Sequence, residues 1–220
     1  MVWDFKKELG RKVIHLFSIF ILVVYNLLAQ TFSHKIALLI LAAFLILTIE
    51  FEYLRVERGM KIPILSLLWR YKRPKELKRL GGEVYFLLGA ILCLALFDLR
   101  VAVAAILMTA FGDLTAGIVG TRFGKRRVSG LPSKTWEGAA AELLVNLGIG
   151  FLIIRSFVDN KLWWMYSLMP NGDIFWPVVV SMAVVATLVE VLVSKLDDNL
   201  LIPLFAGFTG QMALMLLGLA

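Results

Sequence analysis

The chain has 220 residues, of which 60% are hydrophobic and 18% are charged, and its mean hydropathy is +0.84 with a net charge of +7. This composition excludes an ordinary soluble domain, and it leaves no soluble basic face for nucleic acid. Several apolar runs approach the roughly 20 residues that cross a bilayer, and they do not alternate apolar with polar residues, which predicts helices and not barrel strands. The single cysteine, Cys93, lies inside one run, so neither a disulfide nor a cysteine metal site is expected.

Seven apolar segments predict seven transmembrane helices. In chain order they are residues 13–29, 36–54, 84–97, 99–119, 139–154, 176–193 and 200–219. No linker or sequence repeat marks a second domain. Residues 1–220 are therefore expected to form one all-α polytopic membrane domain.

Lysine and arginine predict the orientation of this domain. With seven spans, 19 of them fall on the side of the N-terminus and 4 on the other side. The positive-inside rule then places the N-terminus and the active-site loops in the cytoplasm. The basic loop 55–82 also carries apolar residues, so it is expected to lie in the membrane interface, either as an anchor to anionic lipid or as a surface that gathers substrate.

Unusual polar residues gather at the predicted cytoplasmic ends of the spans, beginning with Asp113. This acid lies about 10 Å inside a helix end, at a depth that costs roughly 2.5–3.5 kcal/mol, so it is a site residue by default. Its natural partner is a cation such as Mg²⁺ carried by a nucleotide. Ala116, Gly120 and Gly124 lie on the same stripe, where small side chains allow either another helix or a ligand to approach the backbone.

The basic loop after this helix and the start of the next helix are expected to bind phosphate. Arg122 opens the loop, which also bears glycine, and Lys134 stands just before a helix that begins near Thr135. Ser133 or Thr135 is expected to cap this helix, leaving its free N–H groups to face an anion. Glu137 in the first turn is either a simple N-terminal acid, a metal ligand or a group that orients the lysine.

A second cluster ends the sixth predicted span. Glu190, Ser194, Asp197 and Asp198 recur at helical spacing, so one face presents three acids, although a solvated loop is the alternative. Glu190 lies among Val and Leu, too deep for free solvation. Pro203 is expected to stop or kink the last helix.

A third cluster lies near the N-terminus, where Glu8, Arg11 and His15 share a helical face. His15 is either a packed interfacial histidine or part of the site. Glu50, at the end of the second span, is flanked by apolar residues and needs a partner, for which Arg11 is the candidate.

With these residues the chain resembles the polyprenol kinase family, which includes dolichol kinase, phytol kinase and the CTP-dependent diacylglycerol kinase. A CTP-binding pattern of that family is matched at full spacing by Asp113, Ala116, Gly120, Gly124, Lys134, Thr135, Glu137 and Gly138. Ser133 replaces the first lysine of the pattern. The family's flanking signatures resemble residues 11–15, 79–83, and Glu190 with 198–203.

Residues 113–138, the central block that carries this pattern, are also similar to CTP:phosphatidate cytidylyltransferase. That family closes with a histidine-glycine-glycine and Asp-Arg-x-Asp motif, whereas this chain has no histidine after His34 and carries Asp198 and Asn199 in that place. The departure favours a kinase.

Residues and resemblance together imply a CTP-dependent kinase that phosphorylates a lipid alcohol. The implied catalytic residues are Asp113, Lys134, Glu137, Glu190, Asp198 and His15. The residues implied in binding CTP are Gly120, Arg122, Gly124, Lys125, Arg126, Thr135, Gly138, Asn199, Arg11 and Glu83. The implied Mg²⁺ ligands are Asp113, Glu137 and Asp198, and the alcohol proton goes to Glu190, Asp198 or His15.

The expected partners are CTP, membrane lipid and a lipid alcohol of the dolichol, phytol or geranylgeraniol type, or a diradylglycerol. One alternative is a cytidylyltransferase that acts on a lipid phosphate. The other is a transporter or scaffold without chemistry, in which the buried acids couple to ions.

Overall fold

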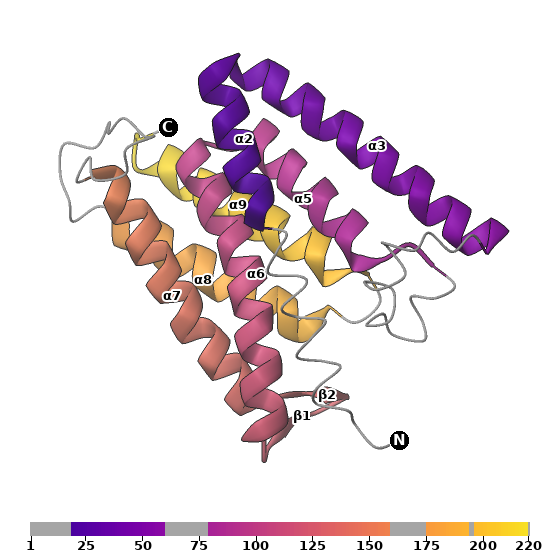
Figure 1. Ribbon diagram of the computed structural model, residues 1–220. Coiled ribbons are helices and arrows are strands. Elements are labelled where there is room, and N and C mark those ends of the chain that lie inside the picture. Colours follow the sequence, from indigo (N-terminus) through magenta and orange to yellow (C-terminus); the bar gives the residue numbers. More distant parts are fainter. Residues whose placement is uncertain (1–18, 60–78, 159–174, 194–195, 220) are drawn as a thin grey trace.

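The computed structural model describes residues 19–59, 79–158, 175–193 and 196–219, which form seven helices and one two-stranded sheet (Figure 1). The elements are α2 (Phe20–Thr31), α3 (His34–Arg58), α5 (Gly82–Leu96), α6 (Leu99–Arg122), β1 (Arg127–Val128), β2 (Leu131–Thr135), α7 (Trp136–Val158), α8 (Phe175–Leu192) and α9 (Asp198–Leu216). Each of the seven predicted apolar segments overlaps one of these helices, which confirms the helical prediction.

Four of the helices are long and apolar enough to cross a membrane, judged by length and composition. They are α3, α6, the Trp136–Ile154 part of α7, and α9, whereas α2, α5 and the Trp176–Leu192 part of α8 are shorter apolar helices. Large apolar side chains such as Leu39, Leu144 and Phe208 are exposed on the outside, as lipid-facing residues are. Seven crossings and a cytoplasmic site remain predictions.

Polar residues and one glycine set the helix ends. Ser33 Oγ accepts a hydrogen bond from the Ile36 N–H at 3.3 Å and begins α3, which ends at Gly59 with a left-handed φ of 61°. Asp197 caps α9 by accepting from the Asn199 N–H at 3.1 Å. Of the two outcomes expected of Pro203, a stop or a kink, the stop is excluded, because α9 continues through it to Leu216.

The accommodation of Pro203 depends on close packing between α5 and α9. A proline lacks the N–H that would pair with the carbonyl four residues earlier, which here belongs to Asn199. Gly89 of α5 faces this position, since a Cβ there would lie 3.0 Å from Pro203 Cγ and 3.1 Å from the Asn199 oxygen. The absence of a side chain at Gly89 lets α5 approach the start of α9.

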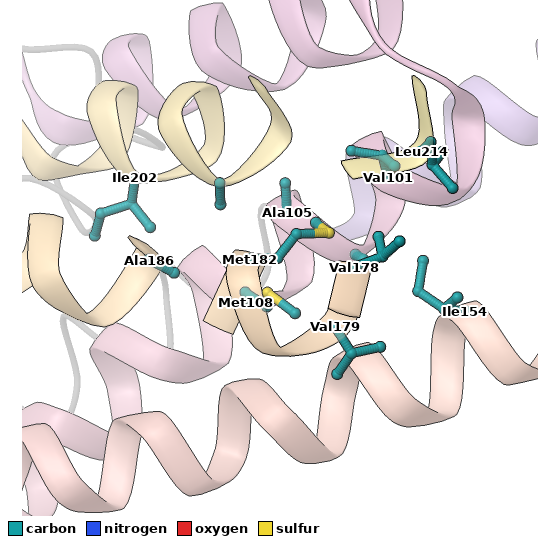
Figure 2. Packing of buried hydrophobic residues seen from close by; sticks show 12 residues of the cluster. Val101, Ala105, Met108, Ile154, Val178, Val179, Met182, Ala186, Ile202 and Leu214 are labelled. Carbon is teal, nitrogen blue, oxygen red and sulfur yellow. The ribbon is translucent and has the colours of Figure 1, made fainter. Parts of the chain in front are cut away.

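The core is built around α6, which runs through the middle of the bundle (Figure 1). On one side, Met108 of α6 packs with Ile154 of α7, Val179 and Met182 of α8, and Leu214 of α9 (Figure 2). A second cluster joins α6 to α2, α3 and α5. Because α6 is buried on both sides, its position sets the position of Asp113.

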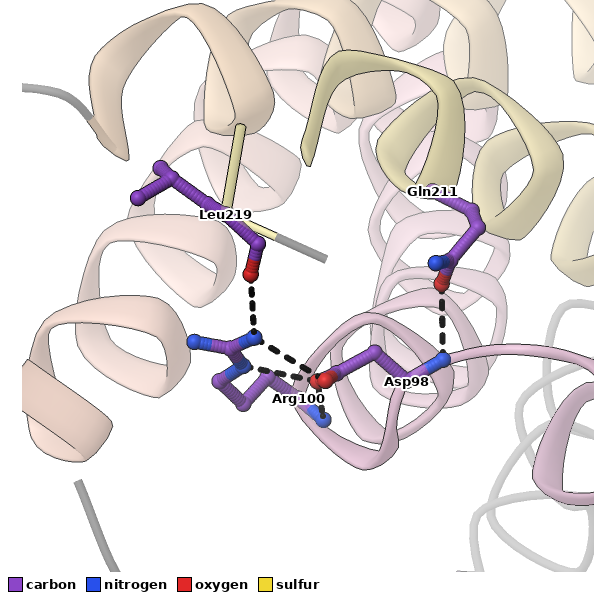
Figure 3. A network of polar contacts seen from close by, with 4 residues as sticks. All are labelled: Asp98, Arg100, Gln211 and Leu219. Atoms are coloured by element: carbon purple, nitrogen blue, oxygen red, sulfur yellow. Dashed lines mark hydrogen bonds and ion pairs between the residues drawn. The ribbon is translucent and has the colours of Figure 1, made fainter. Parts of the chain in front are cut away.

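A polar network fixes the start of α6 against the end of α9 (Figure 3). The Asp98 carboxylate caps α6 and accepts from the Arg100 Nε at 2.7 Å, while the Asp98 N–H donates to Gln211 Oε1 at 2.7 Å. Arg100 also donates to the Leu219 carbonyl at 3.4 Å. This network lies at the other end of α6 from Arg122.

The hairpin between α6 and α7 is not predicted by the sequence, so the all-α expectation holds for the helices but misses this element. β1 and β2 are antiparallel, with Val128 opposite Leu131, and Gly130 takes a φ of 78° in the tight turn between them. The Trp136 N–H donates to the Arg126 carbonyl at 3.0 Å and closes the hairpin where α7 begins.

Candidate active site

Three acids from three different helices meet at one end of the bundle. One carboxylate oxygen from each of Asp113 of α6, Glu190 of α8 and Asp198 of α9 lies within 4.8 Å of the other two. Glu190 is 4% exposed, while Asp113 and Asp198 are partly exposed. The structure therefore brings together residues from two clusters that are 77 positions apart in the chain.

Lys134 of β2 joins this group through its ammonium, which contacts Glu190 Oε1. Burial of Lys134 by itself lowers the lysine pKa, but the negative charges of Glu190, Asp198 and Asp113 offset burial, and the net effect is a raised pKa. Lys134 is thus a positive charge at neutral pH. Its position shows that it belongs with the acids and is not a solvated loop lysine.

The three acids form a donor set suited to a hard divalent cation. All donors are carboxylate oxygens, which Mg²⁺ prefers. Glu190 Oε2 is buried and has no hydrogen-bond partner within the part of the chain that the structure describes. A buried carboxylate oxygen without a donor is costly, so a cation here satisfies a need that the described residues leave open.

Glu137, the remaining predicted metal ligand, is not brought into this group. Its two carboxylate oxygens lie 3.1 and 3.2 Å from the backbone nitrogen of Arg126, whose N–H donates to them. The contact ties the first turn of α7 to the start of the hairpin. The structure places Glu137 where it shapes the basic loop.

The small residues of the central block form a packing seam around Thr135. A Cβ at Gly120 would lie 2.8 Å from Thr135 Oγ1, one at Gly138 would lie 2.8 Å from the Ala116 carbonyl, and one at Gly124 would overlap the Gly120 carbonyl. These contacts are within the protein. Of the two interpretations of the stripe, the geometry favours helix packing over direct contact with a ligand.

Thr135 caps the start of α7, as predicted. Its Oγ1 accepts a hydrogen bond from the Gly138 N–H at 3.2 Å. The Trp136 N–H is also used, by the hairpin, so two of the N–H groups expected to face phosphate have partners within the protein. Ser133, the other candidate cap, has a side chain outside the described part of the chain.

The predicted CTP-binding cations lie on the exposed rim. Arg122, Lys125 and Arg126 are exposed, and the Arg122 guanidinium lies 5.6 Å from the centre of the Phe123 ring. Being exposed, these side chains are accessible to an anion from solution.

Asn199 and Glu83 occupy the α5–α9 side of the site. Asn199 is 8% exposed, and a Cβ at Gly82 would lie 2.6 Å from its Nδ2, so Gly82 at the start of α5 packs directly on it. Glu83 is exposed in the first turn of α5. His15 and Arg11 lie outside the residues that the structure describes.

A buried ion pair that the sequence did not indicate holds the start of α5. Arg55 donates to Glu52 through Nε at 3.0 Å and Nη2 at 2.7 Å, and Glu52 Oε2 also accepts from the Gly81 N–H at 3.0 Å. Glu50 is exposed on the same helix, and Arg11, its candidate partner, lies outside the described residues. In the sequence, the ion pair could have been recognised from Glu52 and Arg55, an acid and a base three residues apart in an apolar helix.

A second missed group lies between α7 and α8, where Glu142 is 1% exposed, Asn146 is fully buried and Thr187 is 8% exposed. Asn146 Nδ2 donates to Thr187 Oγ1 at 3.3 Å and lies 3.5 Å from Glu142 Oε1. An acid and an amide four residues apart on an apolar helix were the signal in the sequence.

Known proteins resemble this chain over most of its length. The model of the protein family described as the cytidylyltransferase family matches residues 4–198. Phytol kinase 1, chloroplastic, of Arabidopsis thaliana is 29% identical over 212 residues, covering 90% of this chain and 64% of that protein. The probable phytol kinase, chloroplastic, of Triticum aestivum is 25% identical over 207 residues, covering 90% of this chain and 65% of that protein. The chain thus spans slightly less than two thirds of these relatives, and no solved structure matches it.

Proposed function

We propose that this chain, which belongs to the cytidylyltransferase family and within it to the polyprenol and phytol kinases, is a CTP-dependent kinase that phosphorylates a membrane lipid alcohol. The observation that carries the proposal is the meeting of Asp113, Glu190 and Asp198 with Lys134 at one end of an apolar helix bundle. Phosphoryl transfer depends mainly on positioning and on charge neutralisation, and this group supplies both.

Mg²⁺ is the metal that this donor set fits, and Asp113, Glu190 and Asp198 would hold it, with Glu190 added to the ligands expected from the sequence. When bound, the ion neutralises charge on the phosphoryl group that is transferred. Glu137 contributes in this proposal by holding the Arg126 backbone, and therefore the basic rim, in place.

The protein's own cations position the nucleotide. Lys134 is held by Glu190 beside the acids, where its ammonium can contact the phosphoryl oxygens. Arg122, Lys125 and Arg126 on the exposed rim attract the triphosphate from solution. Asn199 and Glu83 border the same end of the bundle and are proposed to contact the rest of CTP.

The acceptor hydroxyl attacks the γ-phosphorus, the bond to the β-phosphate oxygen breaks, and CDP leaves. The hydroxyl proton passes to one of the acceptors expected from the sequence, of which Glu190 lies in the acidic cluster beside Lys134. Asp198 and His15 are the other candidates. An isoprenoid alcohol is the proposed substrate class, since the relatives are named phytol kinases. Its tail would remain in lipid beside the exposed apolar side chains.

A second candidate function is transfer of the cytidylyl group to a lipid phosphate, favoured by the description of the matching family. CTP labelled at either the α- or the γ-phosphate separates the two activities in vesicles that contain phytol, geranylgeraniol or phosphatidate. Label from the γ-phosphate in lipid is expected for the kinase. Label from the α-phosphate would identify a cytidylyltransferase, and neither label would favour a non-enzymatic role.

A further inference from the structure

A buried ion pair on α3 binds the backbone that leads into α5. Arg55 Nη2 and Glu52 Oε2 lie 2.7 Å apart, and the two side chains are 7% and 5% exposed. The same Arg55 nitrogen donates to the Arg79 carbonyl at 2.9 Å, while Glu52 Oε2 accepts from the Gly81 N–H at 3.0 Å. The pair therefore holds a backbone carbonyl and a backbone N–H at once, which two apolar side chains of similar size could not do.

Stability alone does not account for a pair of this kind. Two buried charges lose their hydration, and apolar side chains of similar volume commonly stabilise a fold as well or better. The charges add a fixed position for the segment that they bind, because charge-assisted hydrogen bonds are strong and geometrically specific. The segment held by Glu52 and Arg55 is the one that opens α5.

The start of α5 lies against the residue that follows Asp198. α5 lies between α3 and α9 (Figure 1), and a Cβ at Gly82 would lie 2.6 Å from Asn199 Nδ2. Further along α5, a Cβ at Gly89 would lie 3.1 Å from the Asn199 carbonyl oxygen. The Asn199 N–H in turn donates to Asp198 Oδ1 at 3.1 Å. A displacement of the start of α5 would therefore move the carboxylate that α9 contributes to the three acids.

We propose that Glu52 and Arg55 are positioning residues, which set the affinity of the three acids for a divalent cation. They hold the start of α5 against Asn199, and Asn199 orients the Asp198 carboxylate toward the other two acids. The ion pair itself touches neither the cation nor the nucleotide. The inference rests on the proposed function, because that function places the cation among the three acids.

Binding of Mn²⁺ to the full chain in lipid nanodiscs without CTP, measured by electron paramagnetic resonance, tests this role. Arg55→Met removes the cation that binds both Glu52 and the Arg79 carbonyl. Its Mn²⁺ affinity is expected to fall about tenfold, which is the lower end of the effect of losing a residue that orients a metal ligand.

Arg100→Met is the matched control. The Arg100 side chain is also 7% exposed and also pairs with an acid at 2.7 Å, but it lies near the start of α6, away from the three acids. Both variants should lower the melting temperature in metal-free buffer, because each leaves an acid without its partner. Only Arg55→Met should weaken Mn²⁺ binding.

A double variant separates position from stability. Glu52→Leu with Arg55→Met replaces the ion pair by apolar side chains, so its melting temperature should recover toward that of the wild type. Its Mn²⁺ affinity should stay as low as that of Arg55→Met, because the Arg79 carbonyl and the Gly81 N–H have lost the side chains that held them. The Mg²⁺ concentration that gives the half-maximal rate of phosphate transfer should rise in parallel.

Gly82→Ala perturbs the contact between α5 and Asn199 and leaves the ion pair intact. The added Cβ would displace the Asn199 amide, which is the end of a flexible side chain, so the melting temperature should change less than in Arg55→Met. Weaker Mn²⁺ binding is again expected.

Wild-type affinity for Mn²⁺ in the double variant or in Gly82→Ala would overturn the inference, and so would equal losses of affinity in Arg55→Met and Arg100→Met. A wild-type protein that binds no Mn²⁺ would overturn it as well. Failure of the proposed function has a different result. A protein that binds Mn²⁺ in an Arg55-dependent manner but transfers no phosphate from CTP would leave the inference standing and remove the kinase.

Discussion

Replacing Lys134 with methionine removes the ammonium that contacts Glu190 while keeping a side chain of similar length. The Glu190 side chain is 5% exposed and that of Lys134 is 24% exposed, so the variant leaves a buried carboxylate without its partner. Breaking a buried pair in this way costs about 3–5 kcal/mol, and the partial exposure of the lysine favours the lower end, about 3 kcal/mol.

The double variant Lys134→Met with Glu190→Gln supplies the sharper test. It removes both charges, so its free energy of unfolding is expected within about 1 kcal/mol of the wild type, although it should be inactive. The assay is denaturant unfolding of the wild type, the two single variants and the double variant in detergent with EDTA. Because the pKa of Lys134 is raised, the ammonium stabilises the folded protein fully at neutral pH. This contribution to the free energy of unfolding is lost only as the pH rises through the pKa of Lys134 in the folded protein.

Two outcomes would refute this reasoning. Wild-type stability of Lys134→Met would show that the pair does not form, and losses that simply add in the double variant would show that the two residues are not coupled. Either result would remove Lys134 from the cluster.

The exposed cations near the hairpin, the glycine packing around Thr135 and the predicted membrane orientation each give a further prediction. Lys125→Ala should lower kcat at saturating CTP less than Lys134→Ala, because Lys125 is exposed among other cations and its effect is screened by salt. Equal losses of kcat would contradict the placement of Lys134 at the phosphoryl group. Gly124→Ala should destabilise the protein by about 1–3 kcal/mol, because the added Cβ would overlap the backbone. Gly148→Ala should not, because nothing lies within 4 Å of its Cβ position. Similar unfolding curves for the two variants would contradict the close packing around Thr135. A cysteine at position 128 should be protected from an impermeant reagent in right-side-out vesicles, and labelling there from outside would invert the predicted topology.

The sequence predicts the helices well because long apolar runs need an internally bonded backbone in lipid. It also predicts Asp113, Glu190 and Asp198 as site residues, because acids in apolar runs are costly. It does not predict that the three meet, since that depends on how α6, α8 and α9 pack. The close approach at Gly89 and the packing around Met108 are properties of the folded core.

The errors have physical causes as well. Glu50 and Glu52 look equivalent in an apolar run, but the helical rotation between them places Glu52 inside with Arg55 and leaves Glu50 exposed. The hairpin after α6 is too short for a periodic signal, and its turn depends on the positive φ of Gly130. Glu142 carries the same signal as Asp113, an acid in an apolar run, but the sequence does not show that its side chain turns inward between α7 and α8.

The central claim is that the three acids form the centre for phosphoryl transfer, and Asp113→Asn tests it most directly. This change removes one charge and keeps the shape of a partly exposed side chain, so the fold should be retained. The measurement is transfer of the γ-phosphate from CTP to geranylgeraniol or phytol by purified wild-type and variant protein with Mg²⁺, alongside unfolding of both. The expected result is a loss of at least about a thousandfold in rate, equivalent to roughly 4 kcal/mol, with unfolding little changed. Wild-type turnover by Asp113→Asn would show that the three acids are not the centre for phosphoryl transfer.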